Sequence, residues 1–330
     1  MKMHDRKRSF LRILAGLLIL VLSAGLLAGC SGKKTYKKEQ NTDKHAVTYP
    51  YVVRTPSAEI YLAAADIELM GEEAFYAGLD RMLLYLEDDL QDAKNVLKPY
   101  IYTEIPVIKI YTDFSGRTEM GKREEISGYY SEDSVDIHIF HNWERAQIAL
   151  LHEYTHYLTM HCCSFKLDGF FWSEGIAEYV SKIRCKNRMA VDVNYGMDEE
   201  SLKMLMERGA GTEDGKLDLR KCYYGTAAIY RSEMALGGQY LAVSQAVTTL
   251  TESQLKAPLM NEVTYYEAAC MLEYLVDQYG EEKVFTHLDM SGKQLQEFYG
   301  KTFIELCDEW TAYNLKKCKE LGIRIDGLTS

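Results

Sequence analysis

A pentad near the middle of the 330-residue chain, His152-Glu153-Tyr154-Thr155-His156, acts as a unit only if it is helical. On a helix, residues four apart lie one turn apart on the same side, so both imidazoles could bind one metal ion at about 2 Å. Glu153 lies about 100° further round the helix. Its carboxylate could therefore reach a water molecule beside the ion and accept a proton from it. The pentad predicts a helix that carries two metal ligands and a general base.

Chance alone produces such a pentad in a chain of this length at roughly the one per cent level, so a third ligand is needed to support the prediction. A catalytic zinc ion takes three protein ligands and leaves one position open. Cys162 stands where one class of zinc enzymes has its third histidine, and His161 points about 140° away from His156 on the same helix. Glu174 is the better candidate, because a second helix beginning near Ser173 could cross the first and offer this carboxylate.

Glu178 lies four residues after Glu174, on the same face of that second helix. It could accept a hydrogen bond from the free N–H of a ligand histidine and so fix the orientation of the ring. The alternative is that both acids are solvated on a helix face. Gly175 favours the site, because it permits close approach of another helix. The flanking residues favour it too, because they are of types that are usually buried: Trp172, Ile176, Ala177 and Tyr179.

The segment Trp172-Ser173-Glu174-Gly175-Ile176-Ala177-Glu178-Tyr179, following the pentad with its Tyr157-Leu158, resembles the gluzincin metallopeptidases. It is most similar to the broad bacterial group called peptidase MA-like, and the Tyr-Thr and Tyr-Leu pairs also resemble bacterial collagenases. The similarity is specific over 148–182 and loose over 107–310. It implies a thermolysin-like zincin fold and one zinc ion held by His152, His156 and Glu174, with Glu153 as the base.

The run Tyr265-Tyr266-Glu267-Ala268-Ala269 is similar to the closing helices of the same group. Gluzincins commonly place a tyrosine or histidine from this region over the metal, where it stabilises the oxyanion. Tyr265 is the candidate for this role, with Tyr266 and Tyr224 as rivals, and ordinary packing in a helical core is the alternative for each. The stretch Ser134–Phe140 lacks the Gly-x-Met-Glu-Asn run of related aminopeptidases, which favours an endopeptidase.

The N-terminus predicts export. Lys2 and three further basic residues precede an apolar run from Ile13 to Leu27, which is short for a membrane span. Leu27-Ala28-Gly29-Cys30 has the pattern of a lipoprotein signal, so residues 1–29 would be removed and Cys30 would carry the lipid. An uncleaved anchor helix is the alternative. Both place the rest of the chain on the extracytoplasmic face of the cell membrane. Residues 30–47 are polar and are predicted to be a flexible tether.

Charge and cysteine content restrict the possible partners, metal sites and disulfides. The formal net charge is −11, and it becomes more negative without the basic signal, so nothing suggests nucleic acid as a partner, which would require a basic surface. Seven cysteines remain after Cys30, an odd number, and no Cys-x-x-Cys occurs. A thiolate zinc site therefore has no support. We expect buried thiols and up to one disulfide.

Periodicity predicts an α+β fold with a small mixed or antiparallel sheet in 48–161 and a mainly helical part in 162–330. Two strands, 105–112 and 135–140, flank a polar loop over 116–133 that contains a turn at 131–134, and 135–140 is expected to be an edge strand beside the active-site helix. The predicted helices are 72–90, 143–161 with Asn142 as N-cap, 173–185 with Ser173 as N-cap, 223–236, 265–279, and 302–317 with a capping box at Thr302 and Glu305.

Together these features predict a lipid-tethered, zinc-dependent peptidase. An extended peptide or protein substrate would pair with the edge strand at Val135–Phe140. Two alternatives stay open: a non-catalytic or envelope-assembly surface lipoprotein on the same scaffold, and a zinc hydrolase that acts on another kind of bond.

Overall fold

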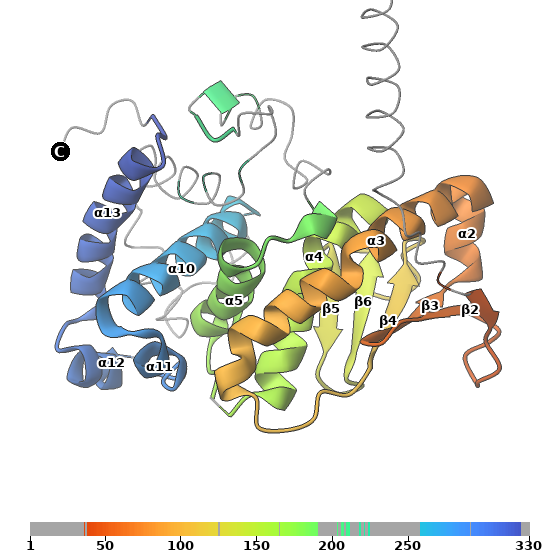
Figure 1. The fold of residues 1–330 in the computed structure, drawn as a ribbon, viewed down its shortest axis with the longest axis horizontal. Coiled ribbons are helices and arrows are strands. Elements are labelled where there is room, and N and C mark those ends of the chain that lie inside the picture. The colour runs from red at the N-terminus through yellow and green to blue at the C-terminus, as the bar shows by residue number, and fades with distance from the viewer. Residues whose placement is uncertain are drawn as a thin grey trace, which may run out of the picture. The chain divides into compact units, whose positions relative to one another are not determined.

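A mixed sheet of six strands, in the order β1-β2-β3-β4-β6-β5, lies in the N-terminal half of the fold (Figure 1). β3 pairs in parallel with β4, and β4 pairs in parallel with β6, while the other neighbours are antiparallel. The strands are β1 (Lys38–Gln40), β2 (Tyr51–Arg54), β3 (Ala58–Leu62), β4 (Ile108–Asp113), β5 (Gly128–Ser131) and β6 (Asp136–Phe140). The sheet and the helices below confirm the α+β class.

This computed structural model describes residues 36, 38–124, 126–164, 166–190, 258–290 and 292–324, and scattered residues between 203 and 224. Apart from Tyr36, all of them belong to one unit, Lys37–Ser330. The predicted signal, Cys30 and most of the predicted helix at 223–236 lie outside the described residues. Within the described part of the chain, no helix is both long enough and apolar enough to cross a bilayer.

Three helical elements lie between β3 and β4 in the chain, and the others follow β6. The helices and helical turns are, in chain order, α2 (Ala64–Met70), α3 (Glu72–Leu97), η1 (Lys98–Tyr100), α4 (Trp143–Tyr157), η2 (Leu158–Cys162), α5 (Phe170–Glu178), η3 (Tyr179–Arg184), η4 (Arg188–Ala190), α10 (Pro258–Tyr279), α11 (Glu281–Phe285), α12 (Gly292–Tyr299) and α13 (Phe303–Glu320). η2 and η3 are π-helical turns that continue α4 and α5.

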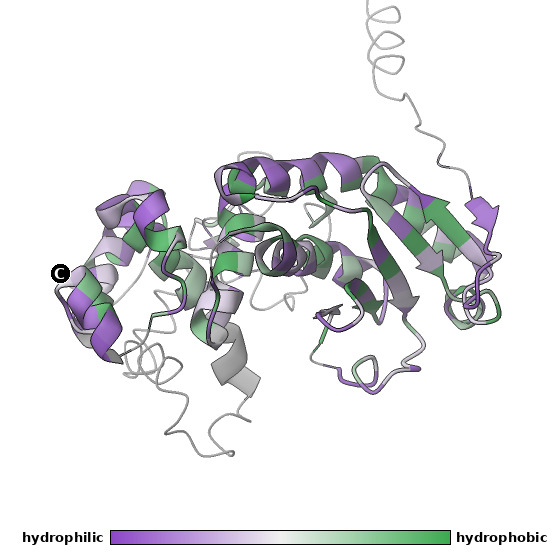
Figure 2. Ribbon diagram, turned by 90° about the horizontal axis from the view of Figure 1, so that it is seen from below, coloured by the Kyte–Doolittle hydropathy of each residue, from purple (hydrophilic) through white to green (hydrophobic). Residues whose placement is uncertain are grey.

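One face of the sheet packs against α4, with α3 alongside (Figure 1). Ile60, Ile110 and Ile137 lie opposite one another on neighbouring strands, and none of them is exposed to solvent. Tyr130 is the next residue in this row, and its ring contacts Tyr157 of α4. The apolar side of α3 is buried as its periodicity predicts, and its hydrophilic residues lie on the outer side (Figure 2).

The prediction that Val135–Phe140 forms an edge strand is wrong. β6 covers most of this stretch, but it lies between β4 and β5. The edge strand is β5, inside the segment that was predicted to be a polar loop. β5 has only four residues, Gly-Tyr-Tyr-Ser, of which Tyr130 alone is buried. So short a strand with one buried side chain has no alternation that a sequence pattern could reveal.

Of the two residues that were predicted to be N-caps of the site helices, one caps its helix and the other does not. Asn142 caps α4, because its side chain accepts a hydrogen bond from the backbone N–H of Arg145 at 2.9 Å. Ser173 does not cap α5, which begins three residues earlier after Gly169. Gly169 has a φ of 80°, a conformation that glycine adopts readily, so the chain enters the helix there. The capping box of Thr302 and Glu305 at α13 is present as predicted.

The folded unit begins inside the segment that was predicted to be a flexible tether. β1 pairs with β2 through backbone groups, which requires no apolar side chain. Asn41 then orders the following turn, since its side-chain amide donates to the carbonyl of Tyr49 at 2.9 Å and to Asp43 at 3.0 Å. Polar composition alone therefore did not distinguish this ordered turn from a tether.

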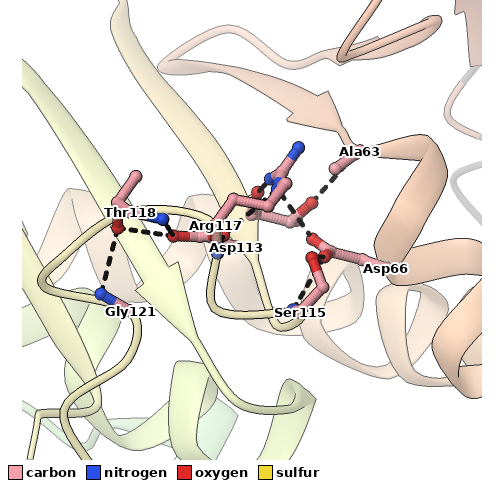
Figure 3. A network of polar contacts seen from close by, with 8 residues as sticks. Ala63, Asp66, Asp113, Ser115, Arg117, Thr118 and Gly121 are labelled. Atoms are coloured by element: carbon pink, nitrogen blue, oxygen red, sulfur yellow. Dashed lines mark hydrogen bonds and ion pairs between the residues drawn. The ribbon is translucent and has the colours of Figure 1, made fainter.

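Two buried aspartates anchor the loop between β4 and β5. Asp113, the last residue of β4, accepts hydrogen bonds from the backbone N–H groups of Arg117 and Thr118 at 2.7 and 3.0 Å. Asp66 of α2 accepts from the backbone and hydroxyl groups of Ser115. Figure 3 shows how these contacts join α2, the end of β4 and the loop. They fix the start of the segment that leads to β5.

The cysteines of the described residues are free thiols and are buried, in agreement with the expected buried thiols: Cys162, Cys163, Cys185, Cys270, Cys307 and Cys318. Cys222 and Cys30 lie outside the described residues.

Candidate metal centre

Three side chains from two helices converge on one point. In α4, Nε2 of His152 and Nε2 of His156 are 3.0 Å apart. Oε2 of Glu174, from α5, lies 3.0 Å from the first nitrogen and 3.3 Å from the second. Both histidines are buried and Glu174 is half-buried. Among the described residues, this is the one cluster of histidine, cysteine and acidic side chains that could hold a metal ion.

The donor atoms fit a single ion. Ligands bound to a tetrahedral metal at about 2 Å lie roughly 3.3 Å from one another. The three separations here are 3.0, 3.0 and 3.3 Å. Two imidazole nitrogens and one carboxylate oxygen form a donor set that leaves one tetrahedral position open, as catalytic zinc sites do.

Gly175 brings the helix that carries Glu174 close to α10. A Cβ atom at this position would lie 3.1 Å from Cδ1 of Leu272 and 3.3 Å from Cβ of Ala268. The close approach that the sequence indicated at Gly175 is therefore present, and the partner is α10. This packing holds α5 at its crossing with α4.

Glu178 contacts the other nitrogen of a predicted ligand. Its Oε1 lies 2.7 Å from Nδ1 of His152, and Glu178 is buried. A carboxylate in this position fixes the ring so that Nε2 faces the cluster. The second helix thus contributes Glu174 to the cluster and Glu178 behind it.

Glu153 lies beside the cluster and is held by the edge strand. Its Oε2 accepts a hydrogen bond from the backbone N–H of Tyr130, in β5, at 2.9 Å. Burial raises the pKa of Glu153 above its ordinary value, although the two neighbouring imidazoles oppose that shift. A carboxylate that is buried and fixed in this way is suited to exchange a proton with a water molecule in the cluster.

The edge strand is the part of this site that sequence analysis missed. Gly128 leaves the space in which Glu153 lies, because a Cβ atom there would be 3.0 Å from Cγ of Glu153 and 3.0 Å from Cβ of Ala149. Gly128 was a possible signal, but a glycine in a polar segment is more often a turn.

Gly128→Ala should therefore displace Glu153 while leaving the three donor atoms in place. If the cluster is a hydrolytic site, kcat should fall by up to about 100-fold, the cost that a displacement of about 1 Å can have. Zinc affinity should stay unchanged. Steady-state kinetics and chelator competition measure the two effects, with Ser131→Ala in the same strand as the control. Equal losses of kcat in both variants would argue against a specific contact at Gly128.

The charges of the cluster depend on one another. Burial lowers the pKa of His152, but the charge of Glu178 and the contact with Glu174 outweigh it and raise this pKa to about 10. Burial raises the pKa of Glu174, but the charges of His156 and His152 outweigh it, and the result is a pKa well below the usual range. The neighbouring carboxylates therefore favour a proton on His152. Binding of a metal ion would release that proton, because a coordinating histidine must be neutral.

The ring of Tyr265 lies next to the cluster. Its ring centroid is 6.0 Å from that of His152, and burial together with the charge of Glu174 raises its pKa above the ordinary value. Its hydroxyl therefore stays protonated at neutral pH and can donate a hydrogen bond. Tyr266 is turned about 100° further round α10. Tyr224 is fully buried and its hydroxyl donates to Glu273, so it is committed elsewhere.

His161, which was excluded as a ligand, packs against aromatic side chains. Its ring lies 5.7 Å from that of Tyr130 and 6.1 Å from that of Tyr157, between centroids. A polar hollow of about 680 Å³ is lined by Thr159 and Met160 of η2 and by Glu132, which follows β5, among other residues.

In comparisons with known protein families, with curated proteins and with solved structures, the chain matches none.

Proposed function

We propose that this chain is a zinc-dependent hydrolase that cleaves peptide bonds, with His152, His156 and Glu174 as ligands. The observation that carries the proposal is the convergence of their three donor atoms within 3.0 to 3.3 Å, next to the buried carboxylate of Glu153. Zinc bound there would polarise the scissile carbonyl and lower the pKa of a water molecule.

The residues around the cluster would carry out the proton transfers. Glu153 would accept the proton of the attacking water and pass it to the leaving amine. Glu178 would keep the ring of His152 in its orientation through the 2.7 Å contact at Nδ1. Tyr265 would donate a hydrogen bond to the oxyanion from the side of α10.

A peptide is the substrate that the edge strand supports. β5 pairs with β6 on one side, and its Tyr130 N–H meets Glu153 on the other. An extended peptide could add alongside β5, as peptides do at other sheet edges. It would then pass Glu153 on its way towards the hollow at Glu132. The absence of the amine-binding run in Ser134–Phe140 favours an endopeptidase.

We further propose that the protein is attached to the extracytoplasmic face of the cell membrane by a lipid on Cys30. The basic and apolar N-terminus and the run Leu27-Ala28-Gly29-Cys30 support this proposal. Radiolabelled palmitate should enter the wild-type protein but not Cys30→Ala.

Metal content and cleavage test the proposed activity together. The purified protein should hold about one zinc ion per chain, as a three-ligand site requires. It should also cleave members of a diverse peptide pool, and a chelator should stop cleavage until Zn²⁺ is restored. Elemental analysis and mass spectrometry of the pool measure these outcomes. Bound zinc without cleavage of any peptide would favour a binding lipoprotein or a hydrolase of another bond. A protein that takes up no zinc would contradict the proposal.

A further inference from the structure

Lys182 is a buried cation that the proposed mechanism does not use. Its side chain is only 4% exposed, and its ammonium group donates a hydrogen bond to the backbone carbonyl of Ile148 in α4. Burial lowers the pKa of Lys182, while the negative charges of Glu178 and Glu153 act in the opposite direction. A lysine is rarely buried without a specific partner, so this position calls for an explanation.

The spacing of Lys182 relates it to the cluster. Glu174, Glu178 and Lys182 follow one another at intervals of four residues, so they lie along one face of α5 and η3. The residues of α4 that they contact are also four positions apart, but their numbers decrease as those of the second helix increase. Glu174 meets His156 and His152, Glu178 meets His152, and Lys182 meets Ile148.

These contacts form three successive links between the two helices. Glu174 and Glu178 have partners that belong to the proposed metal site, whereas Lys182 bonds to a carbonyl one helical turn before His152. Because that carbonyl is part of the backbone, the third link ties Lys182 directly to the backbone of α4.

We propose that Lys182 is a positioning residue that fixes the register of α5 and η3 against α4, and so holds the carboxylate of Glu174 at the two imidazoles. The motif of the second helix is then Glu174-x-x-x-Glu178-x-x-x-Lys182. The proposal rests on the proposed function, because it assigns Lys182 a role in forming the zinc site. It also explains why the lysine is buried beside two carboxylates.

Lys182→Met tests the proposal, because methionine fills similar space but neither donates nor carries charge. Zn²⁺ affinity of the full-length protein, measured by chelator competition, should fall about 10-fold or more, as for other residues that support metal ligands. The visible absorption of the Co²⁺-loaded protein, which depends on ligand geometry, should change as well. Lys182→Arg keeps the charge and the donor, and it should recover most of the affinity.

Arg188→Met is the matched control. Arg188 bonds to the buried Asp89 at 2.8 Å and ties η4 to α3, away from the three links. The Arg188→Met substitution should lower the melting temperature without changing the Zn²⁺ affinity or the Co²⁺ spectrum. If Lys182→Met does not unfold cooperatively, Lys182→Gln replaces it, with the same expected direction.

The outcomes separate the two proposals. If the wild-type protein binds no Zn²⁺, the proposed function fails. If the wild type binds Zn²⁺ and Lys182→Met binds it equally well or more tightly, only the role of Lys182 is overturned. Equal losses of affinity in Lys182→Met and Arg188→Met, at equal losses of stability, would also overturn it.

Discussion

Glu153→Gln should slow hydrolysis strongly while zinc stays bound. We expect kcat to fall about 10²- to 10⁴-fold, the range that general acid-base catalysis contributes. Glutamine has nearly the shape of glutamate, and its side-chain oxygen can still accept the hydrogen bond from the N–H of Tyr130, which is now 2.9 Å from Oε2. What the variant loses is the ability to take a proton. Zinc content and kcat, measured on the same preparation, test both parts.

The structure also predicts that this variant is not destabilised. Burial raises the pKa of Glu153, which means that the surroundings disfavour its charge. A neutral side chain of the same shape avoids that cost, so the melting temperature of the metal-free protein should not fall. Glu144→Gln is the control, because Glu144 is an exposed acid in the first turn of the same helix, α4. Substantial turnover by Glu153→Gln would contradict its role as the base.

Local sequence patterns anticipated the part of the site that lies within single helices. The intervals between His152 and His156, and between Glu174 and Glu178, follow from the helical repeat. Asn142 and the pentad belong to one helix, so its start and its functional face could both be predicted. The contact of Glu178 with His152 was predictable as soon as the two helices were assumed to cross.

The contributions of other segments could not be predicted in the same way. Tyr130 acts through its backbone N–H, which any residue but proline provides, so its side chain carries no signal. Lys182 looks like a solvated residue in the sequence, because its burial depends on a carbonyl 34 residues away. Gly128 matters only because Glu153 and Ala149 lie beside it. Each of these roles depends on a contact between two segments that are distant in the sequence. A pattern within one segment cannot indicate such a contact.

His156→Ala should remove zinc and the stability that zinc provides. Two ligands remain in this variant, and a ligand that binds only the folded state stabilises it by about 4 kcal/mol at 1,000 times its Kd. The melting temperature of the wild-type protein should therefore rise when Zn²⁺ is added, and that of His156→Ala should not. We expect Zn²⁺ affinity to fall more than about 100-fold, beyond the usual effect of a residue that only supports a ligand.

His161→Ala provides the matched control for that loss. His161 lies on the same helical segment, five residues further along, but its ring packs against Tyr130 and Tyr157. Removing its side chain should lower the melting temperature of the metal-free protein. The rise in melting temperature on adding Zn²⁺ should stay the same as in the wild type. Thermal unfolding with and without Zn²⁺ separates the two variants. If His156→Ala kept the full zinc-dependent increase, the ion would bind elsewhere. The convergence of His152, His156 and Glu174 would then not be the zinc site.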